Sequence, residues 1–171
     1  TAIAWIARNT VERQLARIDA LDGENRLFDA AVRARIAGGK GNALANSITG
    51  NSGNNKIDAG AGNDTVSGGA GLDTFRFSSA LNSTTNIDII NGYIPADDSI
   101  EFENAVFTKL VTVGALSALN FKANTAGRAT DSNDYVVYDT NTGKLFYDAD
   151  GNGAGVSVLI ATLTGAPTLT Y

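Results

Sequence analysis

The sequence predicts a mainly β protein in which very short strands stack on one another, followed by an antiparallel β region and preceded by a helical hairpin. Ten of the nineteen glycines fall between Gly38 and Gly71, and this segment repeats every nine residues. Before it, apolar residues follow a helical spacing, and after it they follow strand-like patterns. The predicted divisions are 1–37, 38–77 and 78–171.

The first segment has the pattern of two amphipathic helices. From Ile3 to Ile18 apolar residues recur mostly every three to five residues, and Asp22-Gly23 then interrupts the pattern. A second helical pattern runs from Leu27 to Ile36 and ends at Gly38-Gly39, where glycine can adopt the left-handed conformation of a helix C-cap. We expect these helices to pack on the rest of the protein. The alternative is a membrane-active or partner-binding helix.

The composition removes several kinds of chemistry. The chain contains no Cys, no His and no Met. Disulfides, zinc fingers and His-dependent catalytic triads are therefore impossible. Oxygen donors remain, from carboxylates, amides, hydroxyls and backbone carbonyls. A small extracellular domain without disulfides needs another means of stabilisation, and a metal held by oxygen ligands is the expected one.

The charge distribution argues against a nucleic-acid partner. Residues 1–36 hold six arginines against five acidic residues, whereas the remainder is clearly acidic within a net charge of −5. A protein that binds nucleic acid neutralises phosphates with clustered Lys and Arg, which are missing here. The longest apolar runs, such as Val156 to Ala161, are too short to span a bilayer. Because the chain begins at Thr1 without a leader, we expect a fragment of a longer precursor.

Four nine-residue units can be written in register. They read GNALANSIT (41–49), GNSGNNKID (50–58), AGAGNDTVS (59–67) and GGAGLDTFR (68–76). Small or turn-forming residues fill most of the first four places, Asn or Asp takes the sixth, and a large apolar residue takes the eighth. Six residues therefore turn and three extend, and the apolar residue of each strand can point into a shared interior only if the units stack. The sixth residues are Asn46, Asn55, Asp64 and Asp73, and the eighth are Ile48, Ile57, Val66 and Phe75.

This register resembles the GGxGxDxUx nonapeptide of RTX, or hemolysin-type calcium-binding, repeats. The resemblance continues through FRF, NIDIINGYIPADDSIEF and DYVVYDTNTGKLFYDADGNG, and so covers roughly 38–171. The C-terminal region is similar to that of serralysin-like and other type I-secreted proteins. The resemblance implies a short parallel β-roll at 38–77, in which two nonapeptides make one turn, and a C-terminal β capping and secretion region at 78–171.

The resemblance also implies where calcium binds. Ions sit between loops two repeats apart, so loop 41–46 should face loop 59–64 and loop 50–55 should face loop 68–73. Carboxylates at the sixth position and backbone carbonyls supply the oxygen ligands that calcium requires. The implied ligand residues are Asn46, Gly50, Ser52, Gly53, Asn55, Ala59, Gly60, Ala61, Gly62, Asp64, Gly68, Gly69, Ala70, Gly71, Asp73, Asp88 and Asp98.

The repeats depart from the family pattern in two ways. Two of the four sixth residues, Asn46 and Asn55, donate an oxygen without a charge, and Leu44 stands where glycine is expected. We therefore expect the first pair of loops to bind weakly, or its first loop to act as a cap. The pair that contains Asp73 should be the better site.

Two later aspartates occupy positions where the family closes the end of the roll. These are Asp88 and Asp98, and Gly92 stands where the family often has Asp before an aromatic residue. An alternative is that Asp98 merely begins the strand SIEF.

The C-terminal part predicts three further strands. Tyr135 to Asp139 and Lys144 to Asp148 flank TNTG, with Gly143 in the turn, and Val156 to Leu163 forms another strand. Between them, Asp148, Asp150 and Asn152 form a DxDxNG sequence like the start of an EF-hand loop. The twelfth position is Leu159 instead of Glu, so a tight acidic turn is favoured over this second metal loop.

These patterns predict a calcium-binding module that folds on extracellular calcium and supports type I secretion and folding of a larger bacterial protein. The expected partners are calcium ions and the type I secretion apparatus, and part of the export signal would be missing after TLTY. We expect no enzymatic activity, because Thr65, Ser67 and Thr74 have no base available. A secreted hydrolase remains possible as the parent.

Two alternative functions stay open. One is an adhesin-like or ice-binding solenoid, and the other is a toxin or bacteriocin fragment with active N-terminal helices. The first is disfavoured because the outward strand residues are mixed and form no regular threonine array; they are Ser47, Thr49, Lys56, Asp58, Thr65, Ser67, Thr74 and Arg76. The sequence does not predict an oligomeric state.

Overall fold

The computed structural model describes residues 38–171, with side chains from Gly41 onward. The helical hairpin predicted for 1–37 lies outside the described residues. The described strands are β1 (Gly38–Lys40), β2 (Ser47–Thr49), β3 (Lys56–Asp58), β4 (Thr65–Ser67), β5 (Thr74–Phe77), β6 (Asp88–Asn91), β7 (Ser99–Phe102), β8 (Phe121–Asn124), β9 (Val136–Asp139), β10 (Lys144–Tyr147) and β11 (Val158–Leu163). A single 3₁₀ turn, η1 (Ala118–Asn120), precedes β8 within this range. No helix in the described range has the length and apolarity needed to cross a membrane.

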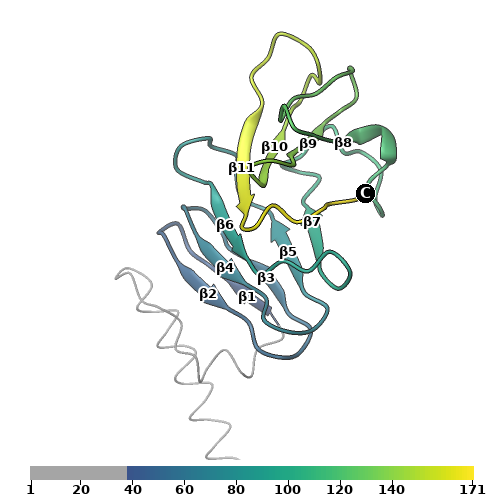
Figure 1. Ribbon diagram of the computed structural model, residues 1–171. Coiled ribbons are helices and arrows are strands. Elements are labelled where there is room, and N and C mark those ends of the chain that lie inside the picture. Colours follow the sequence, from purple (N-terminus) through teal and green to yellow (C-terminus); the bar gives the residue numbers. More distant parts are fainter. Residues whose placement is uncertain (1–37) are drawn as a thin grey trace, which may run out of the picture.

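The nonapeptides form a parallel β-roll, as predicted. Odd-numbered strands pair in one sheet in the order β1-β3-β5-β7, while β2, β4 and β6 pair in the other (Figure 1). Partners in the repeat region are two repeats apart: Ser47 lies beside Thr65, and Lys56 beside Thr74. Each strand is only three or four residues long, so its stability depends on its neighbours in the stack.

The eighth residue of every repeat lies in the interior. Ile48, Ile57, Val66 and Phe75 are 5%, 3%, 3% and 2% exposed. They belong to one core cluster, in which Phe75 contacts the ring of Tyr93 at 5.9 Å between centroids. Burial of one such side chain is worth about 1.5–3 kcal/mol, which is small for each turn of the roll.

Both sheets continue beyond the last nonapeptide. β6 pairs in parallel with β4, and β7 pairs in parallel with β5. Thr65 now lies beside Ile89, and Thr74 beside Ser99, so the connections are longer than two nonapeptides. β6 and β7 therefore add another turn of the same roll, built from a sequence that has lost the nine-residue period.

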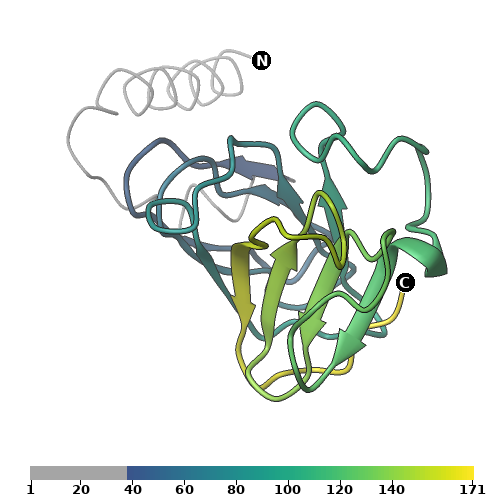
Figure 2. The same cartoon turned by 90° about the horizontal axis from the view of Figure 1, so that it is seen from above.

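The C-terminal region is joined to the roll edge to edge. β11 pairs in parallel with β6, which extends the second sheet to the order β2-β4-β6-β11-β10-β9-β8 (Figure 2). The predicted strand-turn-strand is confirmed: β9 and β10 are antiparallel, and Gly143 in the turn has φ +71°. The predicted antiparallel region is confirmed for β9–β10 and β10–β11, whereas β6–β11 and β8–β9 are parallel. β11 pairs with the backbone groups at the open edge of β6. The local pattern of residues does not predict this pairing.

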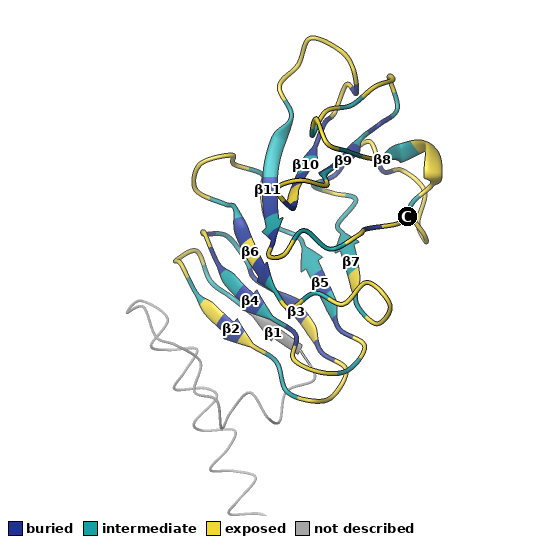
Figure 3. Cartoon of the chain, viewed as in Figure 1, coloured by how far each residue is buried: buried dark blue, intermediate teal, exposed yellow. Residues whose placement is uncertain are grey.

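The C-terminal part has the larger side chains in its core. Tyr138, Phe107 and Leu145 are at most 1% exposed, and Phe107 makes an edge contact with Tyr147 at 5.1 Å between ring centroids. In β2 and β4 one central buried residue lies between less buried neighbours, whereas β9 buries three residues in a row (Figure 3). The two ends of the molecule are thus stabilised by different means.

Candidate metal centre

The sixth residue of each repeat lies at the point where a loop becomes a strand. Asn46, Asn55, Asp64 and Asp73 directly precede β2, β3, β4 and β5. Asp98 directly precedes β7, and Asp88 is the first residue of β6. Because the strands are parallel and stacked, these side chains form two columns, one on each side of the roll.

Each aspartate in a column accepts a hydrogen bond from the backbone N–H of the column residue one turn away, whereas Asn46 and Asn55 accept from Asn42 and Asn51 in their own loops. On one side, Asn46 N–H donates to Asp64 Oδ1 at 2.7 Å, and Asp64 N–H donates to Asp88 Oδ1 at 3.1 Å. On the other side, Asn55 N–H donates to Asp73 Oδ1 at 2.8 Å, and Asp73 N–H donates to Asp98 Oδ1 at 3.1 Å. Asp88 and Asp98 therefore continue the two columns by one turn, and their implied role as calcium ligands stays a prediction.

Two carboxylate oxygens in these columns have no hydrogen-bond donor. Asp64 and Asp73 are each 1% exposed, and the Oδ2 atom of each is buried without a hydrogen-bond partner. The ion pairs formed in the described part of the chain instead join Lys56 and Arg76 to Glu101 and Glu103. A buried carboxylate oxygen without a partner is costly, so each Oδ2 is suited to a cation.

The pKa shifts of the aspartates in the first column also favour a cation there. Burial raises the pKa of Asp64, although the hydrogen bond from the Asn46 backbone opposes this. Burial also raises the pKa of Asp88 to about 7, and the charges of Asp64 and Asp58 contribute to the rise. Closely spaced buried carboxylates disfavour their own ionised forms, and a nearby cation would reverse this effect.

Backbone carbonyls of loop 41–46 face loop 59–64. A β-carbon added at Gly60 would lie 2.7 Å from the carbonyl oxygen of Asn42 and 2.8 Å from that of Gly41. One added at Gly62 would lie 2.5 Å from the carbonyl oxygen of Leu44 and 3.3 Å from Asp64 Oδ1. Gly60 and Gly62 have φ values of +92° and +123°, which favour glycine. The predicted pairing of these loops is confirmed.

The second pair of loops repeats this arrangement. β-Carbons at Gly69 and Gly71 would lie 2.3 Å from the carbonyl oxygen of Asn51 and 2.8 Å from that of Gly53. At Gly68 an added β-carbon would lie 2.1 Å from Asp73 Oδ2, the oxygen without a partner. Only glycine leaves this space open.

The structure adds carbonyls that the sequence analysis missed. Gly41, Asn42, Leu44 and Asn51 were not among the predicted ligands, yet their carbonyl oxygens face the stacked loop. A signal was present for two of them, since Gly41 and Leu44 stand at the same places in their repeat as Gly50 and Gly53, which were predicted. The remaining predicted residues, Ser52, Ala59, Ala61 and Ala70, lie in the same loops, with Ser52 and Ala70 exposed.

Leu44 does not prevent the first loop from stacking. Its side chain is 41% exposed, and its backbone is not among the described residues with positive φ. The carbonyl of Leu44 faces Gly62 just as that of Gly53 faces Gly71. Leu44 therefore gives no structural reason for a weaker first site. Asn46 lacks a charge, but so does Asn55 in the second pair, and the expected difference between the two sites stays a prediction.

Asp58 was predicted to point outward but is 9% exposed. Its Oδ2 accepts a hydrogen bond from Ser78 Oγ at 2.6 Å, and its Oδ1 accepts one from Gly60 N–H at 3.3 Å. The carboxylate at the end of β3 is thus held by one neighbouring donor, Gly60, and by one donor 20 residues away, Ser78. Gly92, which replaces an expected Asp, has φ +70°, a conformation that favours glycine.

The second predicted metal loop is an ordered turn against loop 130–134. Asp150 Oδ2 accepts from Gly155 N–H at 2.9 Å, while Asp148 Oδ1 accepts from Asp150 N–H at 3.3 Å. Asn152 donates through its side chain to the carbonyl of Thr130. Burial raises the pKa of Asp148, and Asp150 contributes to the rise. The oxygens are largely engaged within the turn, which fits the favoured alternative, and metal binding here stays a prediction.

The repeat loops fit a hard cation that prefers oxygen. Within the described residues no group of three or more His, Cys, Asp or Glu side chains gathers around one point. The repeat loops instead combine single carboxylates, side-chain amides and several carbonyls in each pair. Calcium accepts six to eight such ligands in flexible geometry, whereas magnesium requires a strict octahedron.

Comparison with known proteins identifies the repeats. Residues 40–75 match the RTX calcium-binding nonapeptide repeat in four copies. No curated protein matches the chain. Because the matched residues are those that form the two columns of loops, the chain carries a module of four hemolysin-type RTX repeats that bind calcium.

Proposed function

We propose that this chain is a folding and export module of a secreted bacterial protein, switched by extracellular calcium. The observation that carries the proposal is the buried Oδ2 atom of Asp64 and of Asp73, which has no hydrogen-bond partner. Both residues belong to loops that face the backbone carbonyls of the loop stacked on them. When bound, calcium supplies the positive charge that these oxygens lack. Asp64, Asp73 and the facing carbonyls would hold it.

Folding and calcium binding would then be one equilibrium. Stacking brings the buried carboxylates of Asp64 and Asp88 together in one column and places buried Asp73 beside half-buried Asp98 in the other. The single apolar residue of each repeat strand offers little compensation. The free energy of binding a metal that only the folded state holds adds to the free energy of folding. At the low calcium of a bacterial cytosol the repeats would remain unfolded, and outside the cell they would fold.

This switch suits type I secretion. An unfolded chain can pass through a narrow channel, and calcium outside would trap it in the folded form. RTX repeats are typical of type I-secreted extracellular bacterial proteins, which supports this assignment. In this role the chain itself catalyses no reaction. A catalytic, adhesive or toxic activity would belong to the larger protein.

A calcium titration followed by circular dichroism tests the proposal. The chain in excess chelator should show little β signal and should gain it at about 0.1–1 mM calcium, the range of extracellular modules. Magnesium at the same concentrations is the matched control and should be much less effective. An unchanged β signal in chelator would rule out the switch.

The export role needs a separate test. Vesicles that carry a type I exporter should transport the chain when calcium is chelated on the side of entry. Calcium added on that side should fold the chain first and block its transport. Equal transport under both conditions would contradict the role in secretion while leaving calcium binding intact.

A further inference from the structure

Within residues 38–171 the first sheet ends in an open hydrogen-bonding edge at β7. Ser99 N–H donates to the carbonyl of Asp73, and Glu103 N–H donates to that of Phe77, so these groups face β5. Successive residues of a parallel strand point their backbone groups to opposite sides. The N–H and C=O groups of Ile100 and Phe102 therefore face away from β5. In the second sheet the equivalent edge, on β6, is covered by β11, whereas among the described strands none pairs with the outer side of β7.

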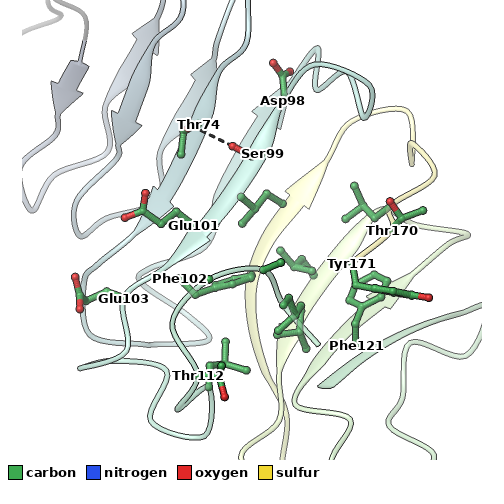
Figure 4. Close-up of a pocket in the computed structure, with 18 of the residues that line it drawn as sticks. Thr74, Asp98, Ser99, Glu101, Phe102, Glu103, Thr112, Phe121, Thr170 and Tyr171 are labelled. Atoms are coloured by element: carbon green, nitrogen blue, oxygen red, sulfur yellow. Dashed lines mark hydrogen bonds between the residues drawn. The ribbon is translucent and has the colours of Figure 1, made fainter. Parts of the chain in front are cut away.

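A cavity of about 950 Å³ lies beside this edge. Figure 4 shows β7 along one side, with Phe121 and the C-terminal residues Thr170 and Tyr171 across from it. Apolar side chains line much of it, including Ile100, Phe102, Leu116, Phe121 and Leu169. The cavity is thus a groove with apolar and polar lining residues that lies beside unpaired backbone groups.

The mouth of the groove is formed by exposed apolar residues. Val113 and Tyr171, which line it, are 88% and 69% exposed, and neighbouring Val111 is 79% exposed. Exposed apolar side chains around a concave site indicate a surface that binds a partner.

The charges beside the groove favour a basic partner over a second copy of this chain. The lining residues include Asp98, Glu101 and Glu103 but neither Lys nor Arg. Lys56 and Arg76 pair with Glu101 and Glu103, so three carboxylates stand beside two cations. Two copies joined through β7 would place these acidic strands against each other, and like charges on facing strands are destabilising.

We propose that this groove binds an extended segment of another polypeptide, which adds to β7 as a fifth strand of the first sheet. Its apolar residues would fill the groove, and Lys or Arg at alternate positions would face the carboxylates. Strand addition takes its affinity from main-chain hydrogen bonds and its specificity from pockets for alternate side chains. This binding would require the folded, calcium-loaded roll and goes beyond its role as a folding switch.

The probe is a fluorescent peptide of about seven residues, the length of an ordinary strand, in which valine and lysine alternate. Its anisotropy is measured against the full chain in saturating calcium. A valine–glutamate peptide, and a peptide with the same valines and lysines in two blocks, should bind about tenfold more weakly. Equal binding of all three peptides would overturn the proposal, as would failure of the alternating peptide to bind.

Two N-methylated peptides test strand pairing directly. One carries the methyl groups on the valine nitrogens, and the other carries them on the lysine nitrogens. Because N–H groups alternate along a strand, only one set can donate to β7. One methylated peptide should therefore lose binding and the other should keep more of it. Equal affinities of the two methylated peptides would exclude strand addition and would mean that only apolar contacts in the groove hold the peptide.

Two matched substitutions test the location. Thr112→Lys adds a positive charge at a lining residue, whereas Thr108→Lys adds the same charge at an exposed threonine outside the lining. We expect Thr112→Lys to weaken binding of the valine–lysine peptide about fivefold, and Thr108→Lys to change it little. Equal effects would place the peptide elsewhere. A calcium-dependent dimer that the peptide dissociates would overturn the choice of a basic partner in favour of a second copy.

Discussion

The repeat region and the C-terminal region share one sheet but are stabilised in different ways. In the roll, each strand from β2 to β5 buries one large apolar side chain at its centre, and carboxylates such as Asp64 and Asp73 are buried beside them. In the C-terminal region, β9 alone buries Val136, Val137 and Tyr138. A hydrophobic core is largely independent of ionic conditions, whereas buried carboxylates without partners require a cation. Calcium dependence is therefore expected to originate in the roll and to reach the C-terminal region through the pairing of β6 with β11.

The largest effect should come from removal of the biggest core side chain of the roll. Phe75→Ala should cost about 3–5 kcal/mol, because Phe75 is 2% exposed and packs against Tyr93. Since folding and calcium binding are coupled, this loss should appear as a much higher calcium midpoint although no ligand is changed. Circular dichroism during a calcium titration measures it. An unchanged midpoint would mean that the roll is not the calcium-dependent part.

The next effect concerns the charge on the two columns. Asp73→Ala should raise the calcium midpoint about tenfold, because it removes the buried Oδ2 and leaves Asn55 N–H without its acceptor. Asp73→Asn keeps an oxygen that can accept this hydrogen bond, so its effect measures the loss of the charge alone. Asn46→Ala should have a smaller effect, since Asn46 contributes no charge and its Oδ1 accepts from Asn42 N–H in its own loop. Equal midpoints for Asp73→Ala and Asn46→Ala would contradict this ranking.

A smaller change in the C-terminal region tests whether the two regions fold together. The Tyr138 hydroxyl donates to the carbonyl of Pro167 at 2.8 Å, so Tyr138→Phe should cost about 0.5–1.5 kcal/mol. If the pairing of β6 with β11 couples the regions, the calcium midpoint should rise slightly and the Tm in saturating calcium should fall. A lower Tm with an unchanged midpoint would show that the regions unfold separately.

The smallest effect is expected at Arg76, the neighbour of Phe75. Its guanidinium pairs with Glu101 and Glu103 near the surface, where ion pairs contribute little. Arg76→Ala should fold at nearly the parental calcium concentration. Phe75→Ala and Arg76→Ala, at adjacent positions, should therefore show the largest and the smallest effect. Identical titrations of Phe75→Ala and Arg76→Ala would mean that the nine-residue register is wrong.

The nine-residue period was enough to predict the roll and its loop pairing. It placed Ile48, Ile57, Val66 and Phe75 inside, and the structure buries all four. A repeated unit with one apolar residue can bury that residue only by stacking on other units. The local pattern of residues is therefore enough to predict the tertiary arrangement of the repeats. Gly143 and the patterns around it likewise predicted the antiparallel pair β9–β10.

The sequence failed where the answer depends on partners far away in the chain. Asp58 has the position of an outward strand residue, and its burial depends on Ser78, which is 20 residues away. Likewise, nothing in the residues of β11 shows that it pairs in parallel with β6 rather than only with β10. The open edge of β7 and the groove beside it could not be predicted either. A strand lies at the edge of a sheet when no other strand pairs with it, and this depends on the rest of the fold.

The sequence by itself determined that the chain carries stacked calcium-binding repeats, which of their residues point inward, and which loops face each other. These properties follow from a short period that repeats the same local physics at each step. Only the tertiary structure decided how the roll ends: β6 and β7 extend it without the repeat, β11 closes one sheet, and the other is left open. An edge strand can accept any neighbour of suitable backbone geometry, so its partner is selected by the packing of the whole domain and not by its own residues.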